Sequence, residues 1–153
     1  MPEEKVRALL VSRLGVPPDA VRIARPRRVF AEVPQERLRK ALEMLKNEEG
    51  FTHLVAITGL DERERFAAIY HLGKEGVVVS IRVPLARENP SVASVMDLFP
   101  SAELYEREMK DLVGIDVSGL PPGNRYPLPD DWPAEDHPLR KDWKPEKGGV
   151  DER

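Results

Sequence analysis

Hydrophobic and polar positions recur along the chain with two different periods, and each change of period marks a new element. Residues 2–14 carry apolar side chains at helical spacing, and a second helix is expected from Pro34 to Gly50, where leucines recur at i, i+4 and i+7. Residues 27–33 alternate instead, with valines and an alanine on one face, which predicts a strand between the two helices.

Three more strands are predicted in the middle of the chain. The run His53–Leu60 is apolar on both faces, as in a strand covered by neighbouring elements, and residues 65–72 and 77–83 alternate around a short glycine loop. We therefore expect an α+β fold with a mixed sheet of about four strands: one β-α-β unit plus an antiparallel meander, with flanking helices.

Two helices are expected after the meander. Ser94, three residues before Asp97, has the spacing of a capping box and predicts a short helix that ends before Pro100. Ser101 caps a longer helix that ends at Gly114, and in it Leu104, Glu108 and Leu112 share one face.

The composition changes at Pro121, because the last 33 residues hold seven of the 15 prolines and show no sustained periodicity. This predicts a globular domain over residues 1–120 and an extended, proline-rich docking tail over residues 121–153. Its few large apolar side chains do not offset the entropy of ordering it, so we expect the tail to need a partner's surface and to be poorly ordered alone.

Composition narrows the class of protein. The chain is 41% hydrophobic and 33% charged with a net charge of −3, and its longest apolar runs are four or five residues, against about 18 to 20 for a spanning helix. Its acidic N-terminus lacks the pattern of a signal peptide, so we expect it to stay in the cytoplasm. The absence of cysteine excludes disulfides and thiolate-held iron–sulfur clusters, and the scarcity of Asn and Gln favours a thermophile.

The titratable residues suggest no strong catalytic or metal site. His53, His71 and His137 are far apart, so no metal site is predicted, and the first two are expected to be hydrogen-bonded histidines of a sheet. The carboxylate pairs Asp130–Asp131 and Glu106–Glu108 leave a small enzyme as an alternative, although turn and charged-face roles suit their positions better.

A run of arginines raises the possibility of RNA binding. It has the density of a phosphate-binding patch, but Phe30, Phe66 and Tyr70 are each isolated and follow the core pattern rather than forming a base-stacking platform. We therefore predict no nucleic-acid partner. The run consists of Arg22, Arg25, Arg27 and Arg28.

Two segments resemble a known signature. Residues 101–115 (SAELYEREMKDLVGI) and residues 128–132 (LPDDW) followed by 137–142 (HPLRKD) are similar to the C-type subunit of respiratory complex I, which has an E-R-E-x-x-D helix, a D-W turn and a P-L-R-K-D tail. The resemblance extends upstream through residues 51–61 and 90–100, and covers roughly residues 20–143.

The chain departs from the complex I pattern at residues 118–123, where Ser-Gly-Leu-Pro-Pro-Gly stands in place of the family's usual Gly-His-Pro and basic segment. It is also short and carries no fused large subunit. These features look more like the counterpart subunit of archaeal membrane-bound [NiFe]-hydrogenases and related sulfur-reducing complexes.

The resemblance implies a non-catalytic accessory subunit in the peripheral arm of a membrane-bound, ion-pumping oxidoreductase. Such a subunit holds no cofactor; iron–sulfur clusters and, in a hydrogenase, a NiFe centre belong to its partners, the large catalytic subunit and small iron–sulfur subunits. It meets the membrane only through the complex, on the cytoplasmic side. The alternatives are a subunit of an NADH- or ferredoxin:quinone oxidoreductase and, in another class, a free-standing RNA- or protein-binding module.

By the same resemblance, we expect no catalytic, cofactor-binding or metal-binding residue and assign one group of residues to a partner interface. Its members lie on the helix of residues 101–114 and in the tail. They are Glu106, Arg107, Glu108, Asp111, Trp132, Pro138, Leu139, Arg140, Lys141 and Asp142.

Overall fold

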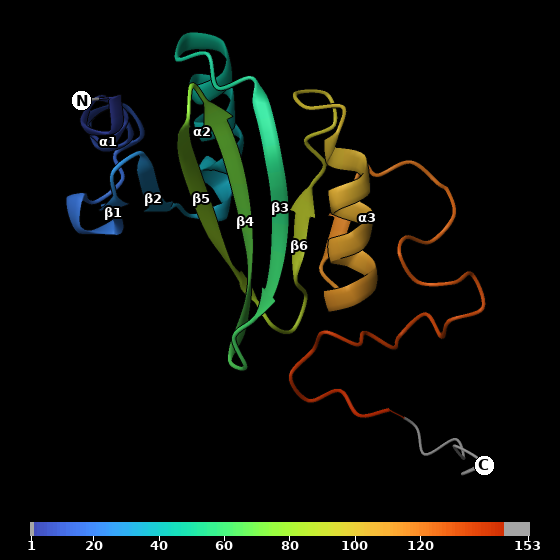
Figure 1. The fold of residues 1–153 in the computed structure, drawn as a ribbon. Helices are drawn as coiled ribbons and strands as arrows, with labels where there is room; N and C mark the ends of the chain where they lie inside the picture. Colours follow the sequence, from blue (N-terminus) through green and yellow to red (C-terminus); the bar gives the residue numbers. More distant parts are fainter. Residues whose placement is uncertain (1, 146–153) are drawn as a thin grey trace.

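The structure is a computed structural model that describes residues 2–145 (Figure 1). Three α-helices, seven strands and three short helical turns follow one another over this range. In chain order they are α1 (Pro2–Leu14), η1 (Pro18–Ala20), β1 (Val21–Arg25), β2 (Arg28–Glu32), η2 (Gln35–Arg37), α2 (Leu38–Glu43), η3 (Met44–Glu48), β3 (His53–Asp61), β4 (Arg65–Lys74), β5 (Val77–Ala86), β6 (Ser91–Ala93), α3 (Ala102–Val113) and β7 (Asp116–Ser118).

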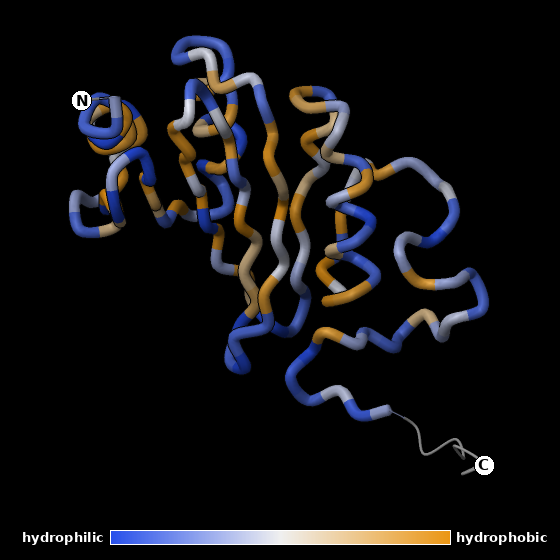
Figure 2. The backbone as a smooth tube through the Cα atoms, in the orientation of Figure 1, coloured by the Kyte–Doolittle hydropathy of each residue, from blue (hydrophilic) through white to orange (hydrophobic). Residues whose placement is uncertain are grey.

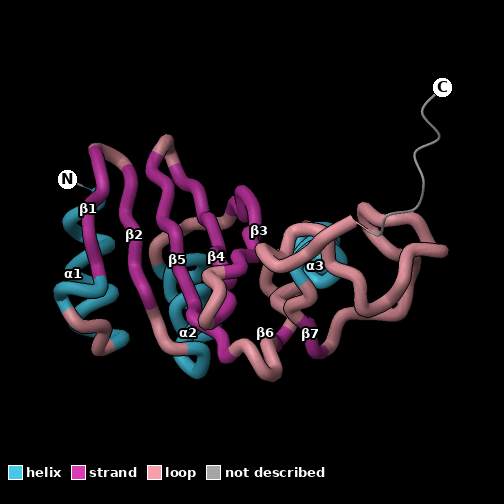
Figure 3. The backbone as a smooth tube through the Cα atoms, turned by 90° about the horizontal axis from the view of Figure 1, so that it is seen from below, coloured by secondary structure: helices cyan, strands magenta, loops and turns pink. Residues whose placement is uncertain are grey.

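The main sheet has five strands in the order β1-β2-β5-β4-β3, as Figure 3 shows from left to right. Strand β2 runs parallel to β5, and the other neighbouring pairs are antiparallel. The predicted α+β class and mixed sheet are confirmed, with one strand more than expected. The β-α-β unit is split, because β5 and β4 lie between β2 and β3.

The helices pack on one face of this sheet. Helix α1 contacts β1 and β2, and α3 contacts β3. Along β4 the residues toward the helices, Phe66, Tyr70 and Leu72, are at most 1% exposed. Gly59 lets α3 approach β3 closely, because a Cβ there would lie 2.7 Å from Met109 Cγ.

The prediction of a short helix between Ser94 and Pro100 is wrong. The chain there leaves strand β6 and enters a turn. The Ser94 hydroxyl accepts a hydrogen bond from Met96 N and donates one to Glu106, so it stabilises the turn and a distant helix rather than a local cap.

The tail of residues 121–145 runs as an irregular segment beside α3 (Figure 1) and is largely hydrophilic (Figure 2). We expected it to need an outside surface, yet it makes hydrogen bonds to its own domain near both ends of the described stretch. The part of the prediction that falls on residues 146–153 lies outside the described residues. None of the helices in residues 2–145 combines the length and apolar content that a membrane crossing requires.

Candidate functional site

The C-terminal end of α3 is capped by the tail. The last i→i−4 bond of the helix runs from Gly114 N to Lys110 O (3.0 Å), and the four carbonyls that follow have no partner inside the helix. Each of the four accepts a hydrogen bond from the tail. The pairs are His137 Nδ1 to Asp111 O (2.8 Å), Leu139 N to Leu112 O (2.9 Å), Arg140 Nε to Val113 O (2.8 Å) and Arg140 Nη2 to Gly114 O (3.4 Å).

Gly114 makes this junction possible. Its φ of 78° lies in the left-handed region that favours glycine, and a Cβ there would lie 2.6 Å from Cδ2 of His137. A side chain at this position would displace the tail from the end of the helix. Gly114, which was expected to end the helix, therefore also allows the tail to pack against the helix end.

Asp61 joins the end of β3 to the tail. Its carboxylate is buried and accepts hydrogen bonds from Arg87 Nη1 (2.7 Å), Arg63 N (2.8 Å) and Lys141 N (2.9 Å). Burial alone raises the pKa of Asp61, but the Arg87 guanidinium and the two backbone N–H groups outweigh it and lower the pKa to about 2. The carboxylate is ionised at neutral pH and binds the tail 80 residues away in the chain.

Glu106, predicted at a partner interface, lies inside the subunit. It is 0% exposed, and its carboxylate accepts bonds from Ser94 Oγ and Val95 N, each at 2.7 Å. Burial raises its pKa. Glu108 lies on the opposite, exposed side of α3, so the two carboxylates do not form an acid–base pair.

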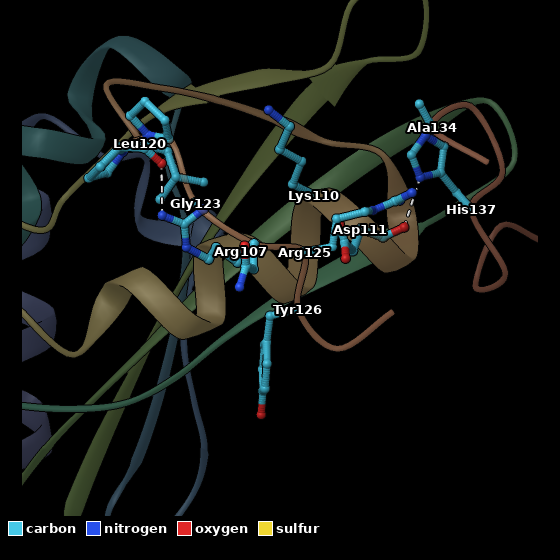
Figure 4. Close-up of a pocket in the computed structure, with 12 residues that line it drawn as sticks. Arg107, Lys110, Asp111, Leu120, Gly123, Arg125, Tyr126, Ala134 and His137 are labelled. Atoms are coloured by element: carbon cyan, nitrogen blue, oxygen red, sulfur yellow. Dashed lines mark hydrogen bonds and ion pairs between the residues drawn. The ribbon is translucent and has the colours of Figure 1, made fainter. Parts of the chain in front are cut away.

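A cavity of about 400 Å³ separates α3 from the tail (Figure 4). On its helix side Arg107 bonds to Glu103 and to the carbonyl of Pro121, and on its tail side Arg125 Nε donates to Asp111 Oδ1 at 3.2 Å. The other Asp111 oxygen is buried and has no hydrogen-bond partner among the described residues. Arg107 and Asp111, which were predicted at a partner interface, therefore line this cavity and bond to the tail of the same chain.

The remaining predicted interface residues divide into inward and outward groups. Arg140 caps α3, and Trp132 donates its indole N–H to Asp136 O at 2.8 Å, so both make contacts within the chain. Pro138 is half-buried. The side chains of Leu139, Lys141 and Asp142 are exposed.

The histidines have separate roles. His71 is half-buried on β4, where Nδ1 lies 2.8 Å from Ser80 Oγ and burial lowers the pKa of the ring, as expected for a hydrogen-bonded sheet histidine. His53 is exposed at the start of β3. No cluster of three or more His, Asp or Glu side chains within residues 2–145 could hold a metal ion.

The large exposed hydrophobic side chains come from three segments of the chain. All of them lie on β3, on α3 or in the tail, and none of the described residues of α1, α2, β1 or β2 belongs to the group. The group comprises Val55 (40% exposed), Leu60 (37%), Leu104 (55%), Tyr126 (43%) and Leu139 (59%). Sequence reasoning missed Leu104 and Tyr126 as surface groups, together with Asp61, because nothing local distinguishes them from core or turn residues.

Comparison with known proteins agrees with this geometry. The model of the family "respiratory-chain NADH dehydrogenase, 30 kDa subunit" matches residues 31–148. The chain is 33% identical over 145 residues to the C-type subunit of the F(420)H(2) dehydrogenase of Methanosarcina mazei, covering 90% of this chain and 91% of the relative. It is 39% identical over 116 residues to the C-type subunit of the NADH-quinone oxidoreductase of Moorella thermoacetica, covering 73% and 77%.

Solved structures show the same fold. The trypsin-resistant fragment of Nqo5 superposes with a TM-score of 0.67 at 30% identity, covering 80% of this chain and all of the fragment. A chain of the membrane-bound sulfane sulfur reductase, an archaeal respiratory membrane complex, superposes with a TM-score of 0.79 at 27% identity, covering 93% of this chain and 85% of that one. With a family match over most of its length and relatives of similar size, the chain belongs to the 30 kDa subunit family of respiratory-chain NADH dehydrogenase, which is the family of the C-type subunit of complex I.

Proposed function

We propose that this chain is a non-catalytic accessory subunit in the peripheral arm of a membrane-bound, ion-pumping oxidoreductase related to complex I, on the cytoplasmic side, where it holds the large catalytic subunit in place. The family match supports a role as a subunit, and the likeness to a chain of the sulfane sulfur reductase supports a hydrogenase or sulfur reductase. The relatives in F(420)H(2) dehydrogenase and NADH-quinone oxidoreductase support a quinone-linked complex as the alternative. In this proposal the iron–sulfur clusters, and the NiFe centre of a hydrogenase, belong to partner subunits.

One observation carries the choice of docking surface: Leu104, Tyr126 and Leu139 are 43 to 59% exposed on α3 and the tail. Exposed large apolar side chains on two adjoining segments are candidates for a protein interface. We call these three residues the α3–tail surface. Glu108, Lys141 and Asp142 are also exposed on these two segments and supply polar groups for its rim.

The test is recovery of partners with a tagged full-length chain, expressed in its own host and purified in mild detergent. We expect wild-type chain to bring down a large subunit and iron–sulfur subunits, visible by mass spectrometry and by the absorbance of the clusters. Leu104→Glu and Leu139→Glu place a charge in the apolar contact and are expected to weaken binding by roughly 2 kcal/mol each. Ala8→Glu, an exposed position on α1, is the matched control.

The alternatives predict other results. A quinone-linked complex would yield the same subunits but a different electron acceptor in an activity assay of the purified complex. A free-standing binding module would be recovered without any iron–sulfur partner. Normal assembly of both leucine variants would contradict the α3–tail surface as the docking site.

A further inference from the structure

A group of arginines without carboxylate partners lies at the opposite edge of the sheet from α3. These residues occupy the hairpin of β1 and β2, in a segment of seven residues that contains no acidic side chain. None of them forms an ion pair with a carboxylate of residues 2–145, whereas Arg39, Arg82 and Arg107 do. We define the arginine hairpin as Arg22, Arg25, Arg27 and Arg28.

Neighbouring groups position these side chains without forming an ion pair with a guanidinium, although the Glu3 carboxylate accepts a hydrogen bond from the backbone N–H of Arg27 at 3.3 Å. The Arg22 guanidinium stacks over the ring of Phe30, its partner across the strand pair, 4.9 Å from the ring centroid. Arg28 Nη1 donates to the carbonyls of Arg27 (2.8 Å) and Gly76 (3.0 Å). Arg25 is exposed. The hairpin therefore presents fixed positive charge to its surroundings.

The turn of the hairpin places an arginine where glycine is favoured. Arg27 follows Pro26 and has a φ of 62°, in the left-handed region that residues other than glycine rarely adopt. Gly76 leaves room for its guanidinium, since a Cβ on that glycine would lie 3.1 Å from Arg27 Nη1. Arg63 and Glu75 adopt the same region in other turns, so the conformation is a feature of the turn, and at Arg27 it places a fourth positive charge at the tip of the hairpin.

The residue type points to an oxyanion ligand, and the surroundings of the hairpin favour the carboxylates of a protein. The group is all arginine and no lysine, and a guanidinium binds a carboxylate or a phosphate with two parallel hydrogen bonds. RNA binding without an exposed aromatic platform is disfavoured, because Phe30 already stacks on Arg22. A lipid surface is disfavoured because none of the large exposed hydrophobic side chains lies on β1 or β2 to enter a bilayer.

We propose that the arginine hairpin is a second docking surface, which binds a carboxylate-rich surface of another protein subunit in the same complex. This inference rests on the proposed function, since it requires that the chain assembles with partners. It is separate from the α3–tail surface, because β1 and β2 form one edge of the sheet and α3 packs on the strand at the other edge (Figure 3). Two surfaces on opposite sides allow the subunit to bridge two neighbours.

Zero-length cross-linking tests this directly. A carbodiimide joins an amine to a carboxylate only when the two are in contact, and arginine does not react. Full-length chains with Arg22→Lys or Arg25→Lys place a reactive amine in the hairpin, and each is purified as the assembled complex in mild detergent. We expect position 22 or 25 to be joined to an Asp or Glu of a partner subunit, as mapped by mass spectrometry.

Lys40, which is exposed on α2, is the internal control amine and is expected to form no partner cross-link. A complex that is recovered intact but shows no cross-link from position 22 or 25 would overturn the hairpin proposal and leave the proposed function standing. A chain recovered without any partner would overturn the proposed function, and this inference with it.

Charge reversal supplies a second measurement. Arg25→Glu is expected to weaken retention of the partner by on the order of tenfold in a salt-wash series, as for loss of a charge-assisted contact. Separate binding tests use vesicles of phosphatidylglycerol and a single-stranded RNA oligonucleotide with the purified chain. Binding of either that Arg25→Glu abolishes would overturn the choice of a protein ligand.

Discussion

Replacing Asp61 with asparagine tests whether the contact between β3 and the tail stabilises the subunit. The substitution keeps the size of the side chain, removes the charge that pairs with Arg87, and turns an amide NH2 toward groups that are themselves donors. We expect a less stable protein whose tail is locally released at Lys141.

The pKa of Asp61 provides the magnitude. It falls from an ordinary 3.8 to about 2, and each pKa unit corresponds to about 1.4 kcal/mol, so ionised Asp61 contributes about 2 kcal/mol to the free energy of unfolding. Because the folded-state pKa is lowered, this contribution is fully present above pH 3.8 and is lost as the pH falls through about 2. Asp61→Asn lacks it at every pH.

Urea denaturation between pH 7 and pH 2 measures this difference. We expect wild type and Asp61→Asn to differ by about 2 kcal/mol at pH 7, and the difference to shrink as the acid limit is approached. Asp142→Asn is the matched control, because Asp142 is exposed and lies 3.7 Å from the same Arg87. It is expected to cost less than about 0.5 kcal/mol.

Hydrogen exchange gives the local result. The Lys141 amide donates to Asp61 Oδ2, so its protection from exchange is expected to fall in Asp61→Asn. The protection of the Tyr70 amide, which lies in the middle of the sheet, is expected to stay unchanged. The reasoning would be refuted by a stability loss below about 0.5 kcal/mol together with unchanged protection at Lys141.

Three further results are expected. Gly114→Ala should lower the free energy of unfolding by at least about 2 kcal/mol and speed hydrogen exchange at the Leu139 amide, because the added Cβ meets His137. An exchange rate at Leu139 equal to that of wild type would contradict capping of α3 by the tail. Glu106→Ala should cost about 2 to 4 kcal/mol in urea denaturation by leaving the Val95 N–H unpaired, and Glu106→Gln about half as much; equal losses would argue against the hydrogen bond. Elemental analysis of the purified chain should find no stoichiometric iron, nickel or zinc, and one equivalent of any of them would contradict a cofactor-free subunit.

The long strands were predictable because their patterning is strong over many residues. Strands β3, β4 and β5 are nine or ten residues long and dominated by apolar residues, and α3 ends at a glycine. Strand β1 was missed because two of its five residues are arginines and it pairs on one side only, so little of it is buried. Short edge strands owe their conformation to a neighbour rather than to their own pattern.

The sequence identified the segments that form the contact between α3 and the tail, but not their arrangement. The motif in residues 101–115 identified α3, yet whether Glu106 faces inward depends on Ser94 and Val95, which precede that motif in the chain. The capping pattern at Ser94 was misread for the same reason, because its hydroxyl bonds to a distant carboxylate. Asp61 and Lys141 are 80 residues apart, and no local rule connects them.

The distribution of polar contacts determines how the tail can serve assembly. Arg140 and the backbone of Leu139 already bond to the end of α3, and the backbone of Lys141 bonds to Asp61. What remains for a partner is the outward set: the side chains of Leu139, Lys141 and Asp142, together with Leu104 in the first turn of α3. A substitution in the outward set should therefore weaken assembly without unfolding the subunit. A substitution at Asp61 or Gly114 should release the tail first and weaken assembly as a consequence, so stability and partner recovery measured on both groups separate folding of the tail from docking by it.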